Sequence, residues 1–381
     1  MKRILTLACA ALLLWSCLPV ARAEAPLQFY DVPSDRYDPV LAQQCLSISE
    51  MCYSLFLQEL YMTGLGYAKV GDWNMDRDPA DTRHTAGYVL FDKPLEDGGS
   101  AVVIAIRGTV SAEWALNMDI APSGDYDLPY AENFYLAAKD ILDTQADYLD
   151  SLNSPRFLVT GHSRGAAVAN LLSALLTDRY GSENVYGYAL ACPRTVRGEV
   201  PFYANIFNVI NPTDIVTYLP FPQWGFTRYG RDMILPVDGA TDAEWQSVLK
   251  AYEARIDKLG EDITLPLTSE DVIRWTEGMT APMTTVREAY TLRHALLHPG
   301  AAASGEEGIT GWQLMENLIG FMLHGQDTEI MRLITAVQPA QNDLTSATDA
   351  IRLLLGSGGV LAILSAHMPA TYGAWMTLLK P

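Results

Sequence analysis

The chain is poor in cysteine and in basic residues, and each shortage excludes a class of protein. Five cysteines in 381 residues are too few for a disulfide-built scaffold. Lys and Arg number 26 against 45 Asp and Glu, giving a formal net charge of −19, and no basic cluster with interleaved aromatic residues occurs. Such a surface repels polyanions, so nucleic-acid binding is not expected. Beyond residue 23, no apolar run reaches the roughly 20 residues that span a bilayer.

The N-terminus carries the pattern of an export signal. A short basic start precedes an apolar run, and Ala21-Arg22-Ala23 supplies a small-x-small cleavage site. We therefore expect residues 1–23 to be a signal peptide and the protein to be secreted or periplasmic. The alternative is a lipoprotein anchored through Cys17, although Trp15 fits that pattern poorly because small residues are favoured beside a lipidated cysteine.

Three cysteines remain after that cleavage. Cys45 and Cys52 lie seven residues apart in the apolar-rich segment Leu41–Leu60, which is expected to be helical. Seven residues of helix rise about 10.5 Å, which is beyond disulfide reach unless the helix is broken. We therefore expect Cys45 and Cys52 to be buried small apolar residues.

Strands and helices alternate between about residues 85 and 229. Short runs rich in Val, Ile and Ala predict strands, and longer 3.6-periodic segments predict helices. The predicted strands are Gly87–Phe91, Ala101–Ile106, Phe157–Thr160, Asn184–Ala191 and Asn205–Ile210, and the predicted helices are Tyr130–Leu152 and Ser163–Tyr180. This alternation predicts βαβ units, a mostly parallel sheet and the α/β class.

The segments before and after this alternating region are expected to form separate parts of the chain. We expect four parts: a signal peptide (1–23), a mostly helical N-terminal segment (24–84), an α/β core (85–238 and 356–381) and a helical insertion, or cap (239–355). Thr241 and Glu244 form a capping box at the first helix of the insertion. Further helices are expected there, including Gly311–His324 and Asp343–Leu355.

The sharpest chemical signal is Gly161-His162-Ser163-Arg164-Gly165, at the junction of a predicted strand and a predicted helix. This context matches a nucleophile elbow, in which a strained turn lifts the serine Oγ clear of the sheet. Gly161 and Gly165 are expected to remove side chains that would collide with neighbouring backbone. The helix start presents N–H groups where an oxyanion would develop. The alternative for Ser163 is a helix N-cap.

Four stretches around this elbow form a recognisable set: Ala105-Ile106-Arg107-Gly108-Thr109, Trp114, the Gly-His-Ser-Arg-Gly motif and Asn208–Pro220. Together they resemble the class 3 lipases, the fungal-lipase-like α/β-hydrolases. Family members carry a similar Asn-x-x-Asp-x-Val-Pro-x-Leu-Pro stretch, and here Thr217 stands in place of its first Pro. Trp224-Gly225-Phe226 and Arg228-Tyr229-Gly230 look most like bacterial members. The resemblance covers about residues 87–230 and the C-terminus, and it implies an α/β-hydrolase fold and ester hydrolysis.

The acid and the base are expected later in the chain, because α/β-hydrolases follow the order Ser…Asp…His. Asp214 follows an apolar strand and stands where the family pattern has its acid. The alternative is a turn-forming Asp after Asn-Pro, and Asp238 is the reserve candidate. His367 lies in a His-x-Pro-x-x-Tyr segment similar to that of bacterial relatives, and we expect it to be the base, with a surface histidine as the alternative.

The other histidines are weaker candidates for the base. His84 precedes the nucleophile, and His162 lies inside the elbow and is expected to point elsewhere. His294 and His298 are four residues apart, but the glutamate of a zinc-binding helix is missing, so no metal is expected. His324 is interpreted as a partner of a helix dipole.

Two donors are expected in the oxyanion hole: the backbone N–H of Arg164 and, by resemblance, Thr109. The predicted function is a serine ester hydrolase that acts on lipid, acylglycerol or small acyl esters without a cofactor and contacts lipid interfaces transiently. A phospholipase, a thioesterase or an acyltransferase would use the same triad. A non-catalytic binding protein on this scaffold is a further alternative.

Overall fold

The structure, a computed structural model, describes residues 26–75, 84–108, 129–256, 269, 272–273 and 366–379. The chain divides into two compact units, Met1–Leu265 with Ile363–Pro381 and Pro266–Ala362. All elements described below belong to the first unit. The helices expected at Gly311–His324 and Asp343–Leu355 lie outside the described residues.

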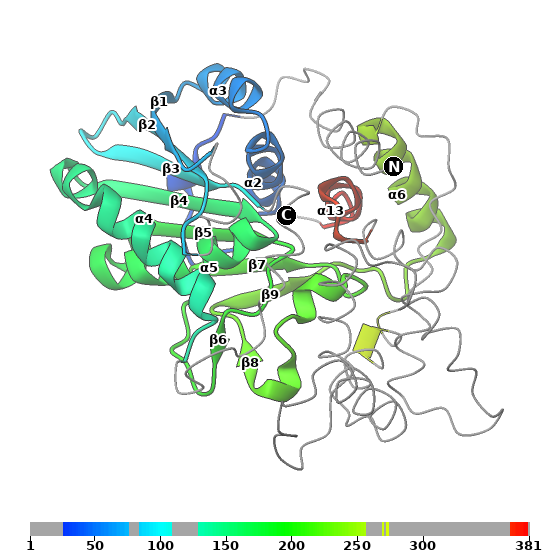
Figure 1. Cartoon of the computed structure of the whole chain (residues 1–381). Helices are drawn as coiled ribbons and strands as arrows, with labels where there is room; N and C mark the ends of the chain where they lie inside the picture. The colour runs from blue at the N-terminus through cyan, green and yellow to red at the C-terminus, as the bar shows by residue number, and fades with distance from the viewer. Residues whose placement is uncertain are drawn as a thin grey trace, which may run out of the picture. The chain divides into compact units, whose positions relative to one another are not determined.

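A seven-stranded, mostly parallel sheet forms the centre of the first unit (Figure 1). Its strands, in spatial order, are β1 (Ala68–Trp73), β2 (Tyr88–Pro94), β3 (Ser100–Ile106), β4 (Pro155–His162), β5 (Val185–Leu190), β7 (Ile206–Ile210) and β9 (Arg231–Ile234). The first two pairings are antiparallel, and all pairings from β3 to β9 are parallel. The sheet therefore confirms the predicted α/β-hydrolase type of core.

Two edge strands and a small ribbon were not predicted. β1 and β9 lie at the two edges of the sheet, and their residues are largely exposed or half-buried. An edge strand needs no continuous apolar run, because one side of its ladder and much of its surface meet water. The ribbon pairs β6 (Val196–Arg197) with β8 (Phe226–Thr227), and two-residue strands leave no periodic signal.

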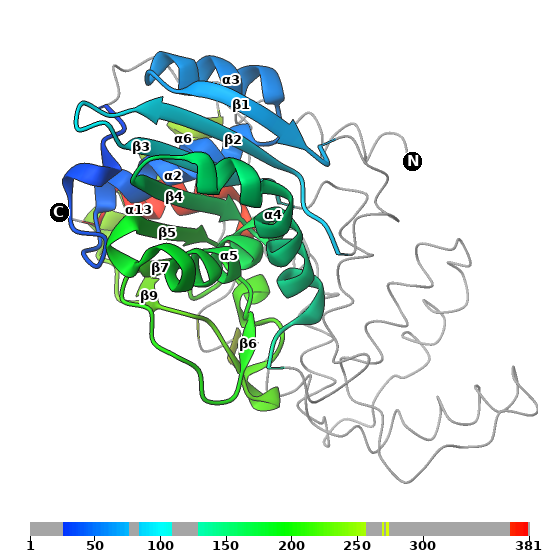
Figure 2. The same cartoon turned by 90° about the vertical axis from the view of Figure 1, so that its left-hand side faces the viewer.

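Helices cover both faces of the sheet (Figure 2). α4 (Glu132–Ser151) and α5 (Arg164–Tyr180) pack on one face, and α2 (Pro39–Met51), α6 (Asp242–Ile256) and α13 (Pro369–Met376) contribute to the apolar cluster on the other. Successive residues of β3 alternate between the faces, so Val102 and Ile104 join α4 and α5 while Val103 and Ala105 join α2 and α13. No helix among the described residues has the length and apolar character to cross a membrane.

The prediction of a single helix over Leu41–Leu60 is wrong. α2 ends at Met51, and a second helix, α3 (Leu55–Gly64), begins four residues later. Cys52 lies at the break, where its Sγ accepts a hydrogen bond from Nε2 of Gln58. This break is invisible in the apolar pattern because both helices bury apolar residues.

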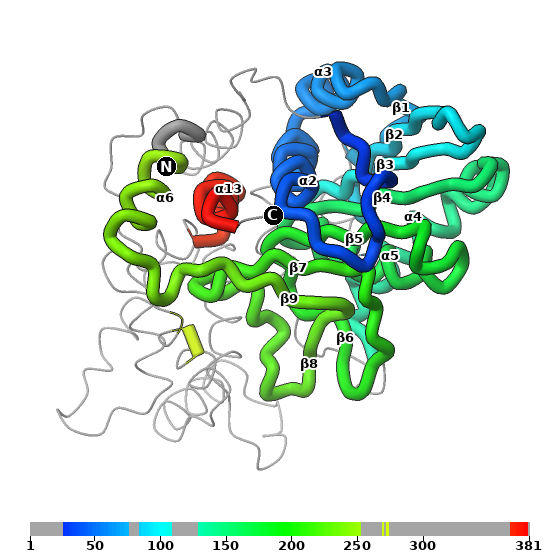
Figure 3. Tube along the Cα trace, turned by 180° about the vertical axis from the view of Figure 1, so that it is seen from behind, coloured from blue at the N-terminus to red at the C-terminus, as the bar shows by residue number. Residues whose placement is uncertain are grey.

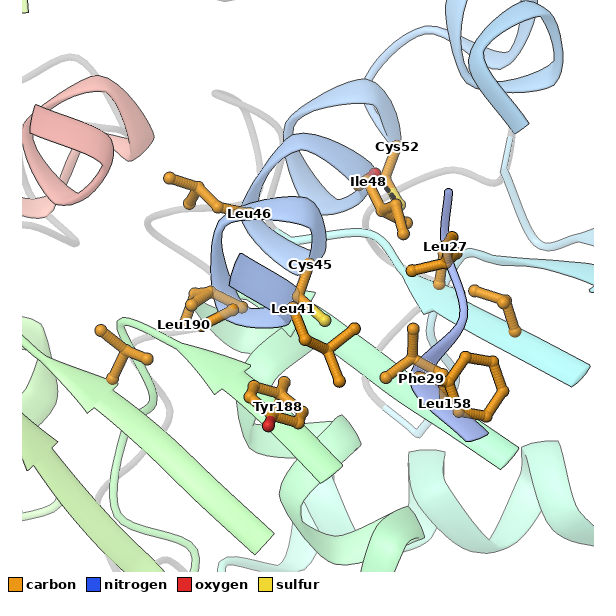
Figure 4. Packing of buried hydrophobic residues seen from close by; sticks show 14 of the residues in the cluster. Leu27, Phe29, Leu41, Cys45, Leu46, Ile48, Cys52, Leu158, Tyr188 and Leu190 are labelled. Atoms are coloured by element: carbon orange, nitrogen blue, oxygen red, sulfur yellow. Dashed lines mark hydrogen bonds between the residues drawn. The ribbon is translucent and has the colours of Figure 1, made fainter. Parts of the chain in front are cut away.

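The prediction that Cys45 and Cys52 are buried is confirmed. No disulfide joins cysteines in the described part of the chain, and Cys192 is fully buried as well. Figure 4 shows Cys45 pointing from α2 toward the sheet. Burial raises the pKa of the Cys45 and Cys192 thiols. These thiols are therefore packing groups rather than reactive ones.

α13 lies between α2 and α6 (Figures 1 and 3). The predicted capping box at the start of α6 is confirmed, because the Thr241 N–H donates to Glu244 Oε2 at 2.9 Å and the Glu244 N–H donates to Thr241 Oγ1 at 3.3 Å. Trp245 of α6 packs against Trp375 of α13, with ring centroids 5.6 Å apart. The four-part division of the chain, with its cap boundary at residue 239, stays a prediction.

Candidate active site

Ser163 lies in a sharp turn between β4 and α5. Its backbone has φ 60° and ψ −126°, a left-handed region that a residue with a side chain rarely enters. The Ser163 N–H donates to the carbonyl of Leu190 at 3.0 Å, and the Ser163 carbonyl accepts from the N–H groups of Ala166 and Ala167. The strained turn that the motif predicts is therefore present and is held by backbone hydrogen bonds.

The elbow glycines allow the backbone of three elements to meet. A Cβ at Gly161 would lie 2.5 Å from the Gly165 backbone and 2.9 Å from the Ile106 carbonyl oxygen of β3. A Cβ at Gly165 would overlap the same carbonyl oxygen. Gly108 is a third such position, where a Cβ would overlap the Tyr53 hydroxyl. These close approaches fit the role expected of Gly161 and Gly165, and Gly108 was not singled out for it.

Ser163, His367 and Asp214 form a continuous chain of hydrogen bonds. Ser163 Oγ lies 2.8 Å from His367 Nε2, and His367 Nδ1 lies 2.8 Å from Asp214 Oδ2. The three residues are buried, with exposed fractions of 7%, 4% and 0%. Because a carboxylate only accepts, Nδ1 carries the imidazole proton and Nε2 is left to accept from the serine hydroxyl.

The sheet explains why these three residues meet. β4 ends at His162 and β7 at Ile210, and β5 lies between the two strands. Parallel strands place their carboxyl ends at one edge, where α/β proteins collect functional side chains. Ser163 and Asp214 follow these two strand ends, and His367 precedes α13. Asp238, the reserve candidate, is exposed, and the carboxylate that His367 contacts is that of Asp214.

The Asp214 carboxylate is held by two further donors. The Tyr372 hydroxyl donates to Oδ2 at 2.7 Å, and the Val216 N–H donates to Oδ1 at 3.0 Å. Burial raises the pKa of Tyr372 well above its ordinary value, and the neighbouring Asp214 raises it further. Tyr372 is a site residue that the sequence analysis missed, although it is the Tyr of the His-x-Pro-x-x-Tyr segment.

His162 also lies beside the base. Its Nε2 donates to the backbone carbonyl of His367 at 2.9 Å, and the two imidazole rings are 4.8 Å apart between centroids. His162 is thus directed at the backbone of His367 and not at Ser163, a contact that the sequence analysis did not anticipate. A motif pattern names the flanking positions of a serine, but it carries no information about which distant backbone a buried side chain will meet.

One of the two predicted oxyanion donors lies in the described part. Arg164 is the first residue of α5, and its guanidinium donates to the Thr85 carbonyl at 2.8 Å. Its backbone N–H thus belongs to the helix N-terminus directly after the serine, where partial positive charge gathers. Thr109 and Trp114 lie outside the described residues, as do His294, His298 and His324. No group of three or more metal-ligating side chains gathers among the described residues.

One family model and two curated relatives match parts of this chain. Residues 103–224 match the family model described as Lipase (class 3). Two curated relatives, the secreted mono- and diacylglycerol lipases A of Penicillium cyclopium and Penicillium camembertii, are each 28% identical over 157 residues, which is 38% of this chain and 50% of theirs. The chain thus spans about half the length of these relatives. They are fungal, so the resemblance to bacterial members is not supported by them.

Solved structures of fungal lipases are also similar to this chain. The triacylglyceride lipase of Rhizomucor miehei is 18% identical, with a TM-score of 0.40 over 51% of this chain and 78% of the lipase. The lipase of Rhizopus microsporus var. chinensis is 16% identical, with a TM-score of 0.41 over 58% of this chain and 84% of the lipase. Ser163 and Asp214 fall inside the family match over residues 103–224, and His367 lies beyond it.

Proposed function

We propose that the protein is a serine carboxylic-ester hydrolase that cleaves lipid or acylglycerol esters through an acyl-enzyme on Ser163. The observation that carries the proposal is the buried hydrogen-bond chain from Asp214 through His367 to Ser163, at a strained strand-to-helix turn. The match of residues 103–224 to the class 3 lipases supports the same reaction. The names of the relatives, mono- and diacylglycerol lipases, support acylglycerols as the substrate class.

The proposed reaction is acyl transfer in two halves. Ser163 Oγ attacks the ester carbonyl while His367 Nε2 takes its proton, and the imidazolium then protonates the departing alcohol. Asp214 orients the ring and stabilises its positive charge. In the second half, His367 Nε2 takes a proton from a water whose oxygen adds to the acyl carbonyl. The imidazolium then returns that proton to Ser163 Oγ as the bond between Oγ and the acyl carbon breaks, which releases the fatty acid and the free serine.

The negative charge on the oxygen of the tetrahedral intermediate must be stabilised by hydrogen-bond donors near the elbow. We assign this role to the Arg164 N–H and to Thr109. Helix N-termini present such donors already oriented, so no reorganisation is needed when the oxyanion forms. Loss of one such donor typically lowers turnover by about 10²–10³-fold.

Export and access to the site belong to the same proposal. Residues 1–23 would direct the protein out of the cytoplasm to a secreted or periplasmic location, as befits a chain whose relatives are named secreted lipases. The predicted cap, residues 239–355, would restrict which acyl chain lengths are accepted. The His-x-Pro-x-x-Tyr segment around His367 favours a bacterial-type member of the family.

The strong net negative charge favours neutral esters over anionic phospholipids at a transient lipid interface.

The test is hydrolysis of p-nitrophenyl esters from acetate to palmitate. Ser163→Ala is expected to lower kcat by roughly 10⁴–10⁶-fold, because the triad acts as a unit. Ser173→Ala is the matched control, since Ser173 is another buried serine, inside the helix α5 that follows Ser163, and should keep wild-type kcat. Equal activity of Ser163→Ala and wild type would refute the assignment of the nucleophile.

The products separate the remaining alternatives. A phospholipase or thioesterase would cleave its own ester class faster than acylglycerols, and an acyltransferase would prefer an alcohol over water as acceptor. A wild-type protein that hydrolyses no ester and binds no fluorophosphonate would instead be a binding protein on a hydrolase scaffold.

A further inference from the structure

His367 reaches the site from a remote part of the sequence. It lies 204 residues beyond Ser163, and the second unit, Pro266–Ala362, comes between them. The helix that follows it, α13, has only eight residues. The imidazole nevertheless stands within hydrogen-bond distance of the serine. Contacts between its own backbone and the strand ends of the sheet therefore help to hold it there.

Two buried side chains bind two consecutive carbonyl groups of this segment. Asn211 Nδ2 donates to the Ala366 carbonyl at 2.9 Å, and His162 Nε2 donates to the His367 carbonyl at 2.9 Å. Asn211 is fully buried and His162 is 4% exposed. A carbonyl that loses its partner in such surroundings has no water to replace it, so both hydrogen bonds hold the segment firmly.

Each of these two donors lies at the same strand end as one of the other two members of the triad. His162 ends β4 and directly precedes Ser163, and Asn211 follows β7 three residues before Asp214. Asn211 is itself fixed, because its Oδ1 accepts from the N–H and the hydroxyl of Thr213. A displacement of either strand end would thus carry its triad residue and its donor together.

His162 can serve only as a donor here. A carbonyl oxygen accepts, so the imidazole proton is on Nε2, and Nδ1 is buried without a hydrogen-bond partner among the described residues. Burial lowers the pKa of His162 well below its ordinary value, and the nearby His367 lowers it further. The ring therefore stays neutral and does not compete with His367 for the serine proton.

We propose that His162 and Asn211 are positioning residues that dock the base-bearing peptide Ala366–His367 on the carboxyl edge of the sheet. This inference rests on the proposed triad and adds the device that aligns it. The two donors set where the His367 backbone lies, and through it the distance between Nε2 and Ser163 Oγ. A displacement of about 1 Å at such a contact costs on the order of 10²-fold in rate.

The experiment compares two replacements of the His162 ring. His162→Met keeps the approximate volume but has no donor, whereas His162→Gln carries an amide N–H that reaches the same carbonyl. Gln145→Met is the matched control. Gln145 lies on α4, away from the triad, and is 4% exposed, and its Nε2 donates to the Tyr88 hydroxyl at 2.7 Å. Turnover is measured on p-nitrophenyl acetate, a soluble ester that needs no lipid interface.

A specific pattern is expected. His162→Met and Asn211→Leu should lower kcat by about 10²-fold with KM within about threefold of wild type, because substrate binding does not use the docked peptide. His162→Gln should recover at least tenfold of that loss. Gln145→Met should lower the Tm but keep wild-type kcat. Wild-type kcat in folded His162→Met, or equally slow Met and Gln variants that are both folded, would overturn the proposal.

A second readout is independent of turnover. In ¹⁵N-labelled protein the His367 Nδ1 proton, which is hydrogen-bonded to Asp214, should give a protected NMR signal in wild type, His162→Gln and Gln145→Met. It should be lost or broadened in His162→Met. If the wild type neither hydrolyses esters nor reacts with fluorophosphonate, the proposed function fails while this signal still tests the docking. If His162→Met does not fold, His162→Asn, whose amide is too short to reach the carbonyl, replaces it with the same expected loss.

Discussion

The nucleophile and the base reach the same site by opposite routes. Ser163 lies between a strand and a helix that adjoin it in sequence, and its turn is held by hydrogen bonds within the sheet layer. His367 arrives after the second unit and is held by side chains from two distant strand ends. The local half of the site, around Ser163, therefore corresponds to a short sequence motif. The remote half, around His367, depends on contacts between residues far apart in the sequence, which no short motif describes.

The largest effect is expected where the two halves join. Asp214→Asn should lower kcat by about 10⁴-fold, because an amide facing Nδ1 can stabilise the wrong imidazole tautomer and gives no charge to the imidazolium. Asp238→Asn is the matched control and should retain wild-type kcat, since Asp238 is exposed and His367 contacts Asp214 instead. Steady-state kinetics with p-nitrophenyl butyrate measures both. Comparable losses in the two variants would mean that the acid is wrongly assigned.

An added methyl group at the elbow should disrupt the packing around the nucleophile. Gly165→Ala should destabilise the fold by about 3 kcal/mol, because its Cβ would overlap the Ile106 backbone, which has no room to move within the sheet. Gly64→Ala, at the end of α3, meets nothing within 4 Å and should change stability by less than about 0.5 kcal/mol. Urea unfolding curves give both values. A Gly165→Ala protein as stable as wild type would contradict the packing described for the elbow.

The remote half is weakened by the loss of a hydroxyl. Tyr372→Phe removes a donor to Asp214 and an acceptor for the Asn211 N–H, so it should cost about 1–3 kcal/mol of stability and about tenfold in kcat. Tyr186→Phe removes a hydroxyl that donates to the Val32 carbonyl, far from the triad, and should leave kcat at the wild-type level. If both variants keep full turnover, the Tyr372 hydroxyl has no part in aligning the acid.

The smallest effect is a pH dependence of stability. Because burial and the neighbouring His367 hold the folded-state pKa of His162 well below 6.5, its contribution is fully present above the unfolded-state pKa of about 6.5. It is lost as the pH falls below that value, by up to about 1.4 kcal/mol per pH unit. Urea unfolding at pH 7.5 and 5.5 should therefore show a smaller difference in His162→Gln than in wild type.

Gln145→Met is the control for that measurement, because it removes a buried hydrogen bond but no ionisable group and should leave the pH dependence at its wild-type size. An identical pH dependence in wild type and His162→Gln would show that His162 titrates normally in the folded protein.

Much of the core could be predicted from the sequence. The parallel strands are buried on both faces and therefore read as apolar runs, and the elbow combines a strained serine with glycines at every close approach. β1 escaped prediction because an edge strand alternates without a continuous apolar run. The break between α2 and α3 escaped because both helices bury apolar side chains.

The remote half of the site was predicted only in part. Chain order and the family resemblance named Asp214 and His367, and the structure brings both to Ser163. Neither argument reveals which side chains hold the acid and the base in place. The contacts of Tyr372, His162 and Asn211 join residues more than 150 positions apart, and a single sequence carries no pattern for such pairs.

Fluorophosphonate labelling followed by peptide mass spectrometry, on wild type and on His367→Ala, tests directly whether Ser163 is a nucleophile activated by His367. A single adduct is expected, on Ser163, that forms rapidly in the wild type and at least 10³-fold more slowly without the base. An adduct on another residue, or equal labelling rates in the two proteins, would contradict the assignment of Ser163 as a nucleophile activated by His367.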